Sequence, residues 1–452
     1  MFEFKTRLDQ IPSLNLLLFF IIVAVTGIVL FRNSKKDTFS ILLFLLFYEG
    51  LFNYFGVLVL QAHKVIVFLI AIVFFYRKFN KNLISKNDFL LLFVFFLFSV
   101  FFFISYYYNP VSFNFAFSQY FKYFLPVLVL LSFNHAVQKG ININYYFNLI
   151  LLLFKMQIFY SFVKLLLIGF NETVIGSVNL SGGSVAAILP IFAFLLIWAQ
   201  NERQFSKWDW TFILLTLLIP IASNKRAIWF LMPLFVGYFY YFLGGRFSVK
   251  RILSVVIIIP LIFYFGVRFN PSLNKERVIW GSFDFEYVIE YAITHNTGGE
   301  RYQESDVGYG RMGGNQALFD QMLQNPFNIK AMFGYGLSTV YATTYEEFEH
   351  EKFNLAGKSS VSGLGRFYLA NGYFGVMFFI LLVIAICRYL KEFKIRIFFI
   401  LFFLFDLFSY SGIIFNARTI SVLFVLSIIF ISNRHALSKP TQQQRFIPLY
   451  AK

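Results

Sequence analysis

Four arginines stand where their side chains could bind an anion: Arg226, Arg311, Arg366 and Arg418. Arg226 follows Lys225 at the start of an apolar segment, and Arg366 and Arg418 each begin another. A guanidinium group is a planar fork that fits phosphate oxygens two at a time. We therefore expect these residues to form an anion site. The alternative, for Lys225 and Arg226 above all, is that long basic side chains merely reach from an apolar helix to a membrane surface.

A glycine-rich segment surrounds Arg311 and reads GYGRMGG at residues 308–314. Glycines let a backbone approach a ligand closely, and the start of the helix expected next would favour an anion. No Gly-Lys-Ser/Thr follows, so the segment is not a P-loop. A glycine-rich turn without a ligand is the alternative reading.

Two further glycine-rich segments follow, FGYGLS at 333–338 and GLGRFYLANGYFG at 363–375. The second leads into an apolar segment and carries Arg366. Charges embedded at a membrane are costly and usually functional. We therefore expect the four arginines to converge on one outward-facing site.

The long segment between two apolar regions also holds candidates for a general base: Glu304, Asp306 and His350. Each could accept a proton from an attacking hydroxyl group, and the sequence does not choose among them. Tyr309 and Tyr335 could stack on a sugar ring, and Arg301 is a further cation for substrate binding. The alternatives are solvated loop positions for the acids and the histidine, and core positions for the tyrosines.

The elements that must position these residues are strongly apolar. The chain has 452 residues, of which 59% are hydrophobic and only 13% are charged, and its net charge is +17. A soluble domain carries about 25% charged residues, so a cytosolic enzyme is excluded. An apolar chain with excess basic residues is typical of a polytopic membrane protein whose basic residues lie in loops on one side.

Each membrane span needs about 20 apolar residues and must be helical, because lipid offers no partner for backbone polar groups. The sequence predicts spans at 13–31, 39–60, 65–76, 88–107, 119–136, 145–168, 182–199, 210–222, 226–243, 252–267, 366–387, 396–412 and 415–432. Lys and Arg concentrate in the connections after the odd-numbered spans, whereas 108–118 and 169–181 contain none. The odd-numbered side is therefore predicted to be cytoplasmic. Lys5 and Arg7 do not fit, because this topology places them outside.

The predicted fold class is thus an all-α polytopic membrane protein with about 12–13 transmembrane helices and one large, partly helical periplasmic loop. The predicted regions are spans 1 to 10 (1–267), the loop (268–365), spans 11 to 13 (366–432) and a cytoplasmic tail (433–452). A connection this long is usually functional or disordered, and its apolar content indicates that it folds. Within it, 314–324 has helical spacing, with Leu318 and Met322 on one face.

The only cysteine is Cys387, inside an apolar run. An intrachain disulfide and a cysteine metal site are therefore excluded. No internal repeat is evident, which gives no support to a transporter built from inverted repeats.

The motifs have a recognisable order. A middle helix begins with an arginine, and the large loop that follows contains Gly-Arg, a short helix, FGYGLST (333–339) and LGRFYLANGYFGVMFF (364–379). This order resembles the O-antigen polymerase and ligase superfamily, which includes the Wzy-type polymerases. The resemblance covers 220–390 by motif and the whole chain by topology.

The resemblance implies a GT-C-like integral membrane glycosyltransferase of the bacterial inner membrane that uses no metal ion or cofactor. Its site faces the periplasm, and both its donor and its acceptor are oligosaccharides carried on undecaprenyl pyrophosphate. In the family, arginines that match Arg226 and Arg311 engage the pyrophosphate. Membrane lipid and a chain-length regulator are the other partners that it implies, and nucleic acid is not among them.

One departure from the family pattern concerns a histidine. Ligases of the superfamily carry an essential histidine shortly before the glycine that Gly372 matches. This sequence has SSVS at 359–362 instead, and His350 lies further upstream in an acidic run. The departure favours a polymerase over a ligase that transfers glycan to lipid A-core or to protein.

The predicted reaction is glycosyl transfer with inversion at the anomeric carbon, by analogy with single-step glycoside chemistry. Three alternatives stay open. A ligase would use the same donor with another acceptor. A flippase or other transporter would need polar residues deep in several helices, where the sequence offers few: Glu49, Asn53, Lys155, Gln157, Lys164 and Asp406. A non-catalytic scaffold would leave the arginines without a role.

Overall fold

The computed structural model describes most of the apolar chain. The described residues are 38–52, 57–79, 84–109, 113–170, 174–177, 183–199, 206–223, 229, 237–238, 249–271, 273–297, 311–336, 361–390, 392–408 and 417–438. Within these residues the secondary structure is helical, and no β-strand is formed. The predicted span at 13–31 and most of that at 226–243 lie outside the described residues.

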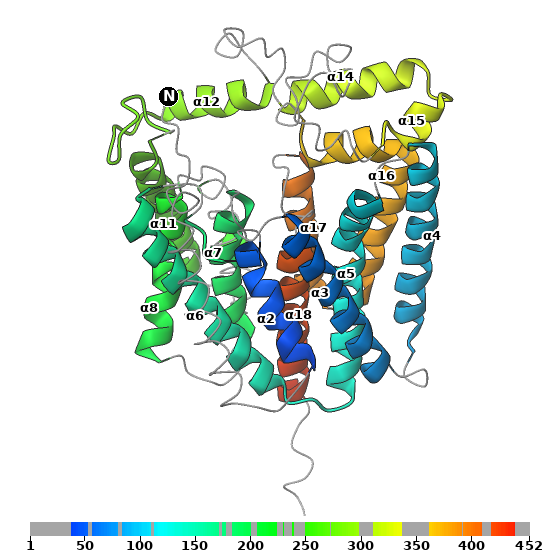
Figure 1. Cartoon of the computed structure of the whole chain (residues 1–452). Helices are drawn as coiled ribbons and strands as arrows, with labels where there is room; N and C mark the ends of the chain where they lie inside the picture. Colours follow the sequence, from blue (N-terminus) through cyan, green and yellow to red (C-terminus); the bar gives the residue numbers. More distant parts are fainter. Residues whose placement is uncertain are drawn as a thin grey trace, which may run out of the picture.

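The helices follow the chain in this order: α2 (Thr38–Phe52), α3 (Val57–Lys78), α4 (Lys86–Tyr108), α5 (Phe113–Gln138), α6 (Ile143–Ile168), α7 (Gly183–Ala199), α8 (Lys207–Leu215), α9 (Ile219–Ala222), α11 (Val249–Phe269), α12 (Phe285–Thr297), α14 (Arg311–Gln324), α15 (Ile329–Phe333), α16 (Gly363–Tyr389), α17 (Phe393–Phe408) and α18 (Ala417–Ser438). The longest of them run alongside one another as a bundle, and α12 and α14 lie across one end of it (Figure 1). We call this the capped end, and the other the opposite end.

Five described helices are long and apolar enough to cross a membrane, and they lie in α3, α4, α5, α6 and α16. The first four have 22 to 26 residues. At 1.5 Å per residue they measure roughly 33–39 Å, more than the hydrocarbon core of a bilayer, which is about 30 Å thick. These helices indicate a membrane-embedded protein, which agrees with the prediction from composition.

The boundary between the second and third predicted spans was wrong. The predicted spans 39–60 and 65–76 leave residues 61–64 between them, but these residues, including the polar Gln61, His63 and Lys64, lie within α3. Neighbouring helices supply the partners that make this possible. His63 Nε2 lies 3.2 Å from the Leu45 carbonyl oxygen, and Lys64 Nζ donates to Ser118 Oγ at 2.6 Å.

The predicted span at 210–222 is interrupted. The structure has α8, then a turn at 216–218, and then the short α9 with Pro220 in its first turn. Proline lacks an N–H group and removes a helical hydrogen bond, so it is unfavourable within a helix, although it is well suited to begin one. The apolar pattern alone did not reveal this break.

The connection from α11 to α16 contains three described helices, which confirms the prediction that it is partly helical. The predicted helix at 314–324 is observed as α14, which begins three residues earlier, and Leu318 and Met322 are both buried. These two side chains belong to a small core formed with Ala331, Val361, Tyr368 and Leu369. The core attaches α14 and α15 to the first turns of α16.

Candidate functional site

The predicted site residues divide into three groups by what the structure describes. Arg366 and Tyr335 are described with their side chains. Arg311 is the first residue of α14 and Arg418 the second of α18, with the backbone alone described. The remaining predicted residues lie outside the described residues: Lys225, Arg226, Arg301, Glu304, Asp306, Tyr309 and His350.

Helices α14 and α16 cross at a pair of buried polar side chains, Asn315 and Ser362. Asn315 Nδ2 donates to Ser362 Oγ at 2.7 Å, and Ser362 N donates to Asn315 Oδ1 at 3.1 Å. Gly365 lies at the same crossing, where a Cβ atom would stand 2.1 Å from Asn315 Oδ1. Only glycine therefore permits this approach. We call Asn315, Ser362 and Gly365 the crossing.

A third helix joins the crossing through Ser362. The Ser362 hydroxyl donates to the carbonyl oxygen of Leu407 at 2.5 Å, near the end of α17. Ser362 is the residue that precedes α16, but its side chain does not cap the helix. The first amides of α16 therefore gain no partner from Ser362, and a helix start of this kind attracts anions.

Two predicted arginines lie close to the crossing along their helices. Arg311 precedes Asn315 by four residues, and Arg366 follows Ser362 by four. Four residues of α-helix correspond to about 6 Å along the axis. Arg366 is half-buried, and its backbone N–H donates to the Ser362 carbonyl at 3.0 Å. The structure thus places the backbones of Arg311 and Arg366 each about one helical turn from the crossing, although they are 55 positions apart in the sequence.

The two glycine-rich segments at 333–338 and 363–375 are joined through their backbones. Helix α16 is kinked at Gly372, where φ is 65°. The kink removes the usual partners, four residues ahead, from the carbonyls of Leu369 and Ala370. The Tyr335 amide donates to the first at 2.7 Å and the Gly336 amide to the second at 3.1 Å. We call these two backbone hydrogen bonds, Tyr335–Leu369 and Gly336–Ala370, the interlock. They satisfy backbone groups that would find no partner in lipid.

Residues at the end of α4 bind the segment that begins with Phe333 from the side opposite α16. Ser105 Oγ donates to the Phe333 carbonyl at 3.1 Å, and Asn109 Nδ2 donates to the Gly334 carbonyl at 3.3 Å. The rings of Phe101 and Phe333 stack with centroids 5.8 Å apart. The segment that begins with Phe333 is thus held between α4 and α16. The sequence analysis did not identify Ser105 or Asn109.

Tyr335, predicted to stack on a sugar, is half-buried beside the core of α14 and α16. Lys330 Nζ lies 4.9 Å from the centroid of its ring. A cation over an aromatic face is attractive. The contacts of Tyr335 therefore fit a structural role in the interlock, and its predicted role with sugars stays a prediction.

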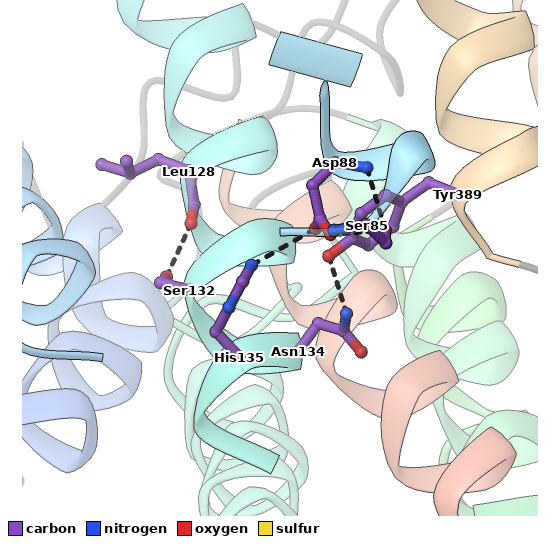
Figure 2. Close-up of polar contacts among 7 residues, drawn as sticks. All are labelled: Ser85, Asp88, Leu128, Ser132, Asn134, His135 and Tyr389. Atoms are coloured by element: carbon purple, nitrogen blue, oxygen red, sulfur yellow. Dashed lines mark hydrogen bonds and ion pairs between the residues drawn. The ribbon is translucent and has the colours of Figure 1, made fainter. Parts of the chain in front are cut away.

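The opposite end contains a buried polar cluster that was not predicted from the sequence (Figure 2). Asp88 of α4 and His135 of α5 are fully buried, with His135 Nε2 3.3 Å from Asp88 Oδ1. Ser85 donates its backbone N–H to Asp88 Oδ2 at 2.6 Å and its hydroxyl at 2.5 Å. Tyr389 of α16 lies beside this carboxylate and accepts a hydrogen bond from Asn134 Nδ2 at 2.7 Å. The cluster ties α4, α5 and α16 together.

This cluster is closed off from solvent. Asp88 and His135 each have at most 1% of their side chains exposed. The spacing Ser85-x-x-Asp88 is a capping box for α4, which the sequence alone could have revealed. His135 lies 47 residues away from Asp88, so the pair itself could not be foreseen from spacing.

A buried lysine lies in α6. Lys164 is 1% exposed, and its Nζ donates to the Gly176 carbonyl at 2.7 Å. The segment 174–177 that contains this carbonyl is itself buried, and Ser177 N donates to Gln157 Oε1 at 2.6 Å. The connection after α6 was predicted as a plain outer loop, but part of it folds into the bundle.

Metal binding finds no support in the described part of the chain, where no three His, Cys, Asp or Glu residues are grouped. The chain matches no protein-family model, and comparisons with curated proteins and with solved structures also gave no match.

Proposed function

We propose that the chain is a polysaccharide polymerase of the bacterial inner membrane. It would join undecaprenyl-pyrophosphate-linked repeat units of the O-antigen or capsule type on the periplasmic face. The observation that carries the proposal is the crossing, which brings the backbones of Arg311 and Arg366 within about one helical turn of the same hydrogen-bonded pair. Two arginines beside an uncapped helix start form a setting suited to a pyrophosphate.

The proposed reaction is a single displacement. A hydroxyl group of the acceptor sugar attacks the anomeric carbon of the donor, and the bond from that carbon to the pyrophosphate oxygen breaks. The electron pair of that bond leaves with undecaprenyl pyrophosphate, and the hydroxyl proton passes to a base. Arg226, Arg311 and Arg366 would stabilise the negative charge as it grows on the leaving group. The configuration at the anomeric carbon inverts.

The base is proposed from Glu304, Asp306 and His350, as the sequence suggested. Any of the three could accept the proton at the moment of attack. Replacing them one at a time, as Glu304→Gln, Asp306→Asn and His350→Gln, separates the choices. The base is the residue whose loss flattens the rise of the polymerisation rate with pH.

A transporter of lipid-linked glycan is the second candidate, and one observation favours it. The helices bury Glu49 and Lys164, as predicted, and three further ionisable side chains: His63, Asp88 and His135. Ionisable residues within membrane helices often mark transport pathways. Against this, Asp88 and His135 pair with each other, and Lys155 of α6 forms an ion pair with Asp209 of α8.

One experiment separates the candidates. The purified chain in vesicles receives lipid-linked repeat units as its only glycan. A polymerase produces a ladder of longer lipid-linked products, and a transporter moves the unit across the bilayer without joining any. A ligase gives neither result until lipid A-core or an acceptor protein is added. Absence of a ladder from correctly inserted protein would refute the polymerase.

A further inference from the structure

The loop between α11 and α12, residues 270–284, is built around one buried side chain. Asn274 is fully buried, and its Nδ2 donates to the carbonyl oxygens of Asn270 at 3.1 Å and Val278 at 2.8 Å. Its Oδ1 accepts from Val278 N at 3.2 Å. The bonds on both sides of this amide fix the path of the loop up to Val278.

The fixed loop presents three apolar side chains outward. Val278, Ile279 and Trp280 are 50%, 44% and 46% exposed. Trp280 has φ 67°, a left-handed conformation that is unfavourable for a bulky residue. Arg268 holds it there, with its guanidinium carbon 4.2 Å from the Trp280 ring and its Nε donating to the Gly281 carbonyl at 2.9 Å. Specific contacts therefore hold the apolar tip of the loop, Val278 to Trp280, in its exposed position.

Helix α12 continues the apolar surface. Phe285, Ile289 and Ile293 are four residues apart in turn, so they form one stripe, and they are 57%, 43% and 57% exposed. The protein-facing side of α12 is formed by Tyr287 and Val288, which are buried. We call the exposed set the apolar shelf: Val278, Ile279, Trp280, Phe285, Ile289 and Ile293.

The shelf is continuous with the exposed side of α11. Trp280 packs on Phe269 with centroids 4.8 Å apart, and Phe285 lies 6.4 Å from Phe263. Below these rings, α11 exposes an apolar stripe at spacings of one to four residues: Leu253, Val256, Ile257, Leu261 and Phe265. An apolar helix that exposes such a stripe in a membrane-embedded protein faces lipid.

Charged residues also lie near the shelf. Lys275 and Asp284 form an ion pair, and Glu276 accepts hydrogen bonds from the backbone and side chain of Ser282. Glu290 is exposed on α12 and stands about 100° around the helix from Ile289. The helix thus has a protein-facing side, an apolar exposed side and an acidic exposed side.

We propose that the apolar shelf rests in the boundary between lipid headgroups and acyl chains at the capped end, with α12 parallel to the membrane plane. Lipid fits better than a second protein copy, because the shelf extends the exposed stripe of α11 without interruption. Tryptophan, phenylalanine and arginine at the end of an apolar helix are also the composition of the membrane–water interface. This placement does not depend on the enzymatic proposal.

Spin labels provide the test. Cys387 is the only cysteine and is buried, so a Cys387→Ala background accepts single labels at Ile289→Cys and at the matched control Glu290→Cys. The full chain is placed in nanodiscs of phosphatidylcholine and phosphatidylglycerol. Relaxation is then measured with oxygen, which concentrates in lipid, and with a water-soluble nickel chelate.

We expect the two labels to differ in which reagent reaches them more. The label at Ile289 should collide more with oxygen than with the nickel chelate, and the label at Glu290 more with the chelate. Equal access of the chelate to both labels would show that water covers the shelf. Protection of the Ile289 label from both reagents would show that protein covers it, whether a second copy or another part of this chain. Either result overturns the proposal.

Discussion

The two ends of the bundle hold their helices together in different ways. At the opposite end, Asp88 and His135 are fully buried, with His135 Nε2 3.3 Å from Asp88 Oδ1. At the capped end, the crossing uses the neutral groups Asn315 and Ser362, and the described ion pair Lys275–Asp284 is partly exposed. Buried polar groups resist rearrangement because a group left without its partner is costly. The polar contact at the opposite end is therefore closed to solvent, whereas the ion pair at the capped end stays within reach of water.

The largest expected effect follows from breaking the buried pair. Asp88→Ala leaves His135, Tyr389 and the Ser85 amide without this carboxyl group, and each buried polar group left unsatisfied costs about 1–3 kcal/mol. Unfolding can be followed by reaction of the buried Cys387 with a thiol-reactive fluorophore, and the thermal midpoint should fall steeply. The paired variant Asp88→Leu/His135→Leu should recover much of the loss. A midpoint unchanged in Asp88→Ala would show that the opposite end is not held by this pair.

The interlock at the capped end should be next in sensitivity. In Gly372→Ala the new Cβ would stand 2.4 Å from the Met332 carbonyl, in addition to the strain of φ 65°. Gly140→Ala is the matched control, because φ there is 78° and no atom lies within 4 Å. The control should cost about 1–2 kcal/mol from its backbone alone, and Gly372→Ala a further 1–3 kcal/mol or so from overpacking. Equal thermal midpoints for Gly372→Ala and Gly140→Ala would mean that α15 shifts to accommodate the new Cβ without loss of stability.

The crossing tests whether neutral groups suffice at the capped end. Asn315→Ala removes the partner of the buried Ser362 amide and hydroxyl, and an unsatisfied buried polar group costs about 1–3 kcal/mol. The thermal midpoint should fall less than in Asp88→Ala. Gln316→Ala, on the exposed residue beside it, serves as the control and should be close to neutral. A larger loss in Asn315→Ala than in Asp88→Ala would reverse the comparison.

The smallest effect is expected from the exposed pair. The hydrogen bond from Lys275 holds the pKa of Asp284 below its ordinary value of 3.8. Since the folded-state pKa is the lower one, the pair stabilises the loop above pH 3.8 and this contribution is lost as the pH falls from there through the folded-state pKa. A spin label at Ile279→Cys should become more mobile over that range. The same label with Asp284→Asn should show no such change, and a response that persists would exclude Asp284 as its source.

The sequence predicted elements with a local signature and missed contacts between distant segments. Helix α14 was predicted because Leu318 and Met322 share one face, and both are buried. The backbone hydrogen bond from Tyr335 to Leu369 could not be predicted from the pattern of side chains, although both glycine-rich segments were identified as candidates.

The predicted boundary between two membrane spans was wrong for a related reason. A polar residue such as His63 looks like the end of a span, unless a neighbouring helix supplies a partner. The pair of Asp88 and His135 was hidden in the same way, because its two halves lie on different helices. Partners from other helices cannot be read from one sequence, so buried polar positions are where such predictions fail.

The most direct test of the central claim is the ladder assay on lipid-linked repeat units with Arg311→Ala and Arg366→Ala, each checked for insertion and thermal midpoint. Lys275→Ala is the matched control, because it removes a basic residue from the same connection between α11 and α16. We expect each arginine variant to polymerise about 10²–10³-fold more slowly, while the control forms a normal ladder. Normal ladders from both arginine variants would contradict it.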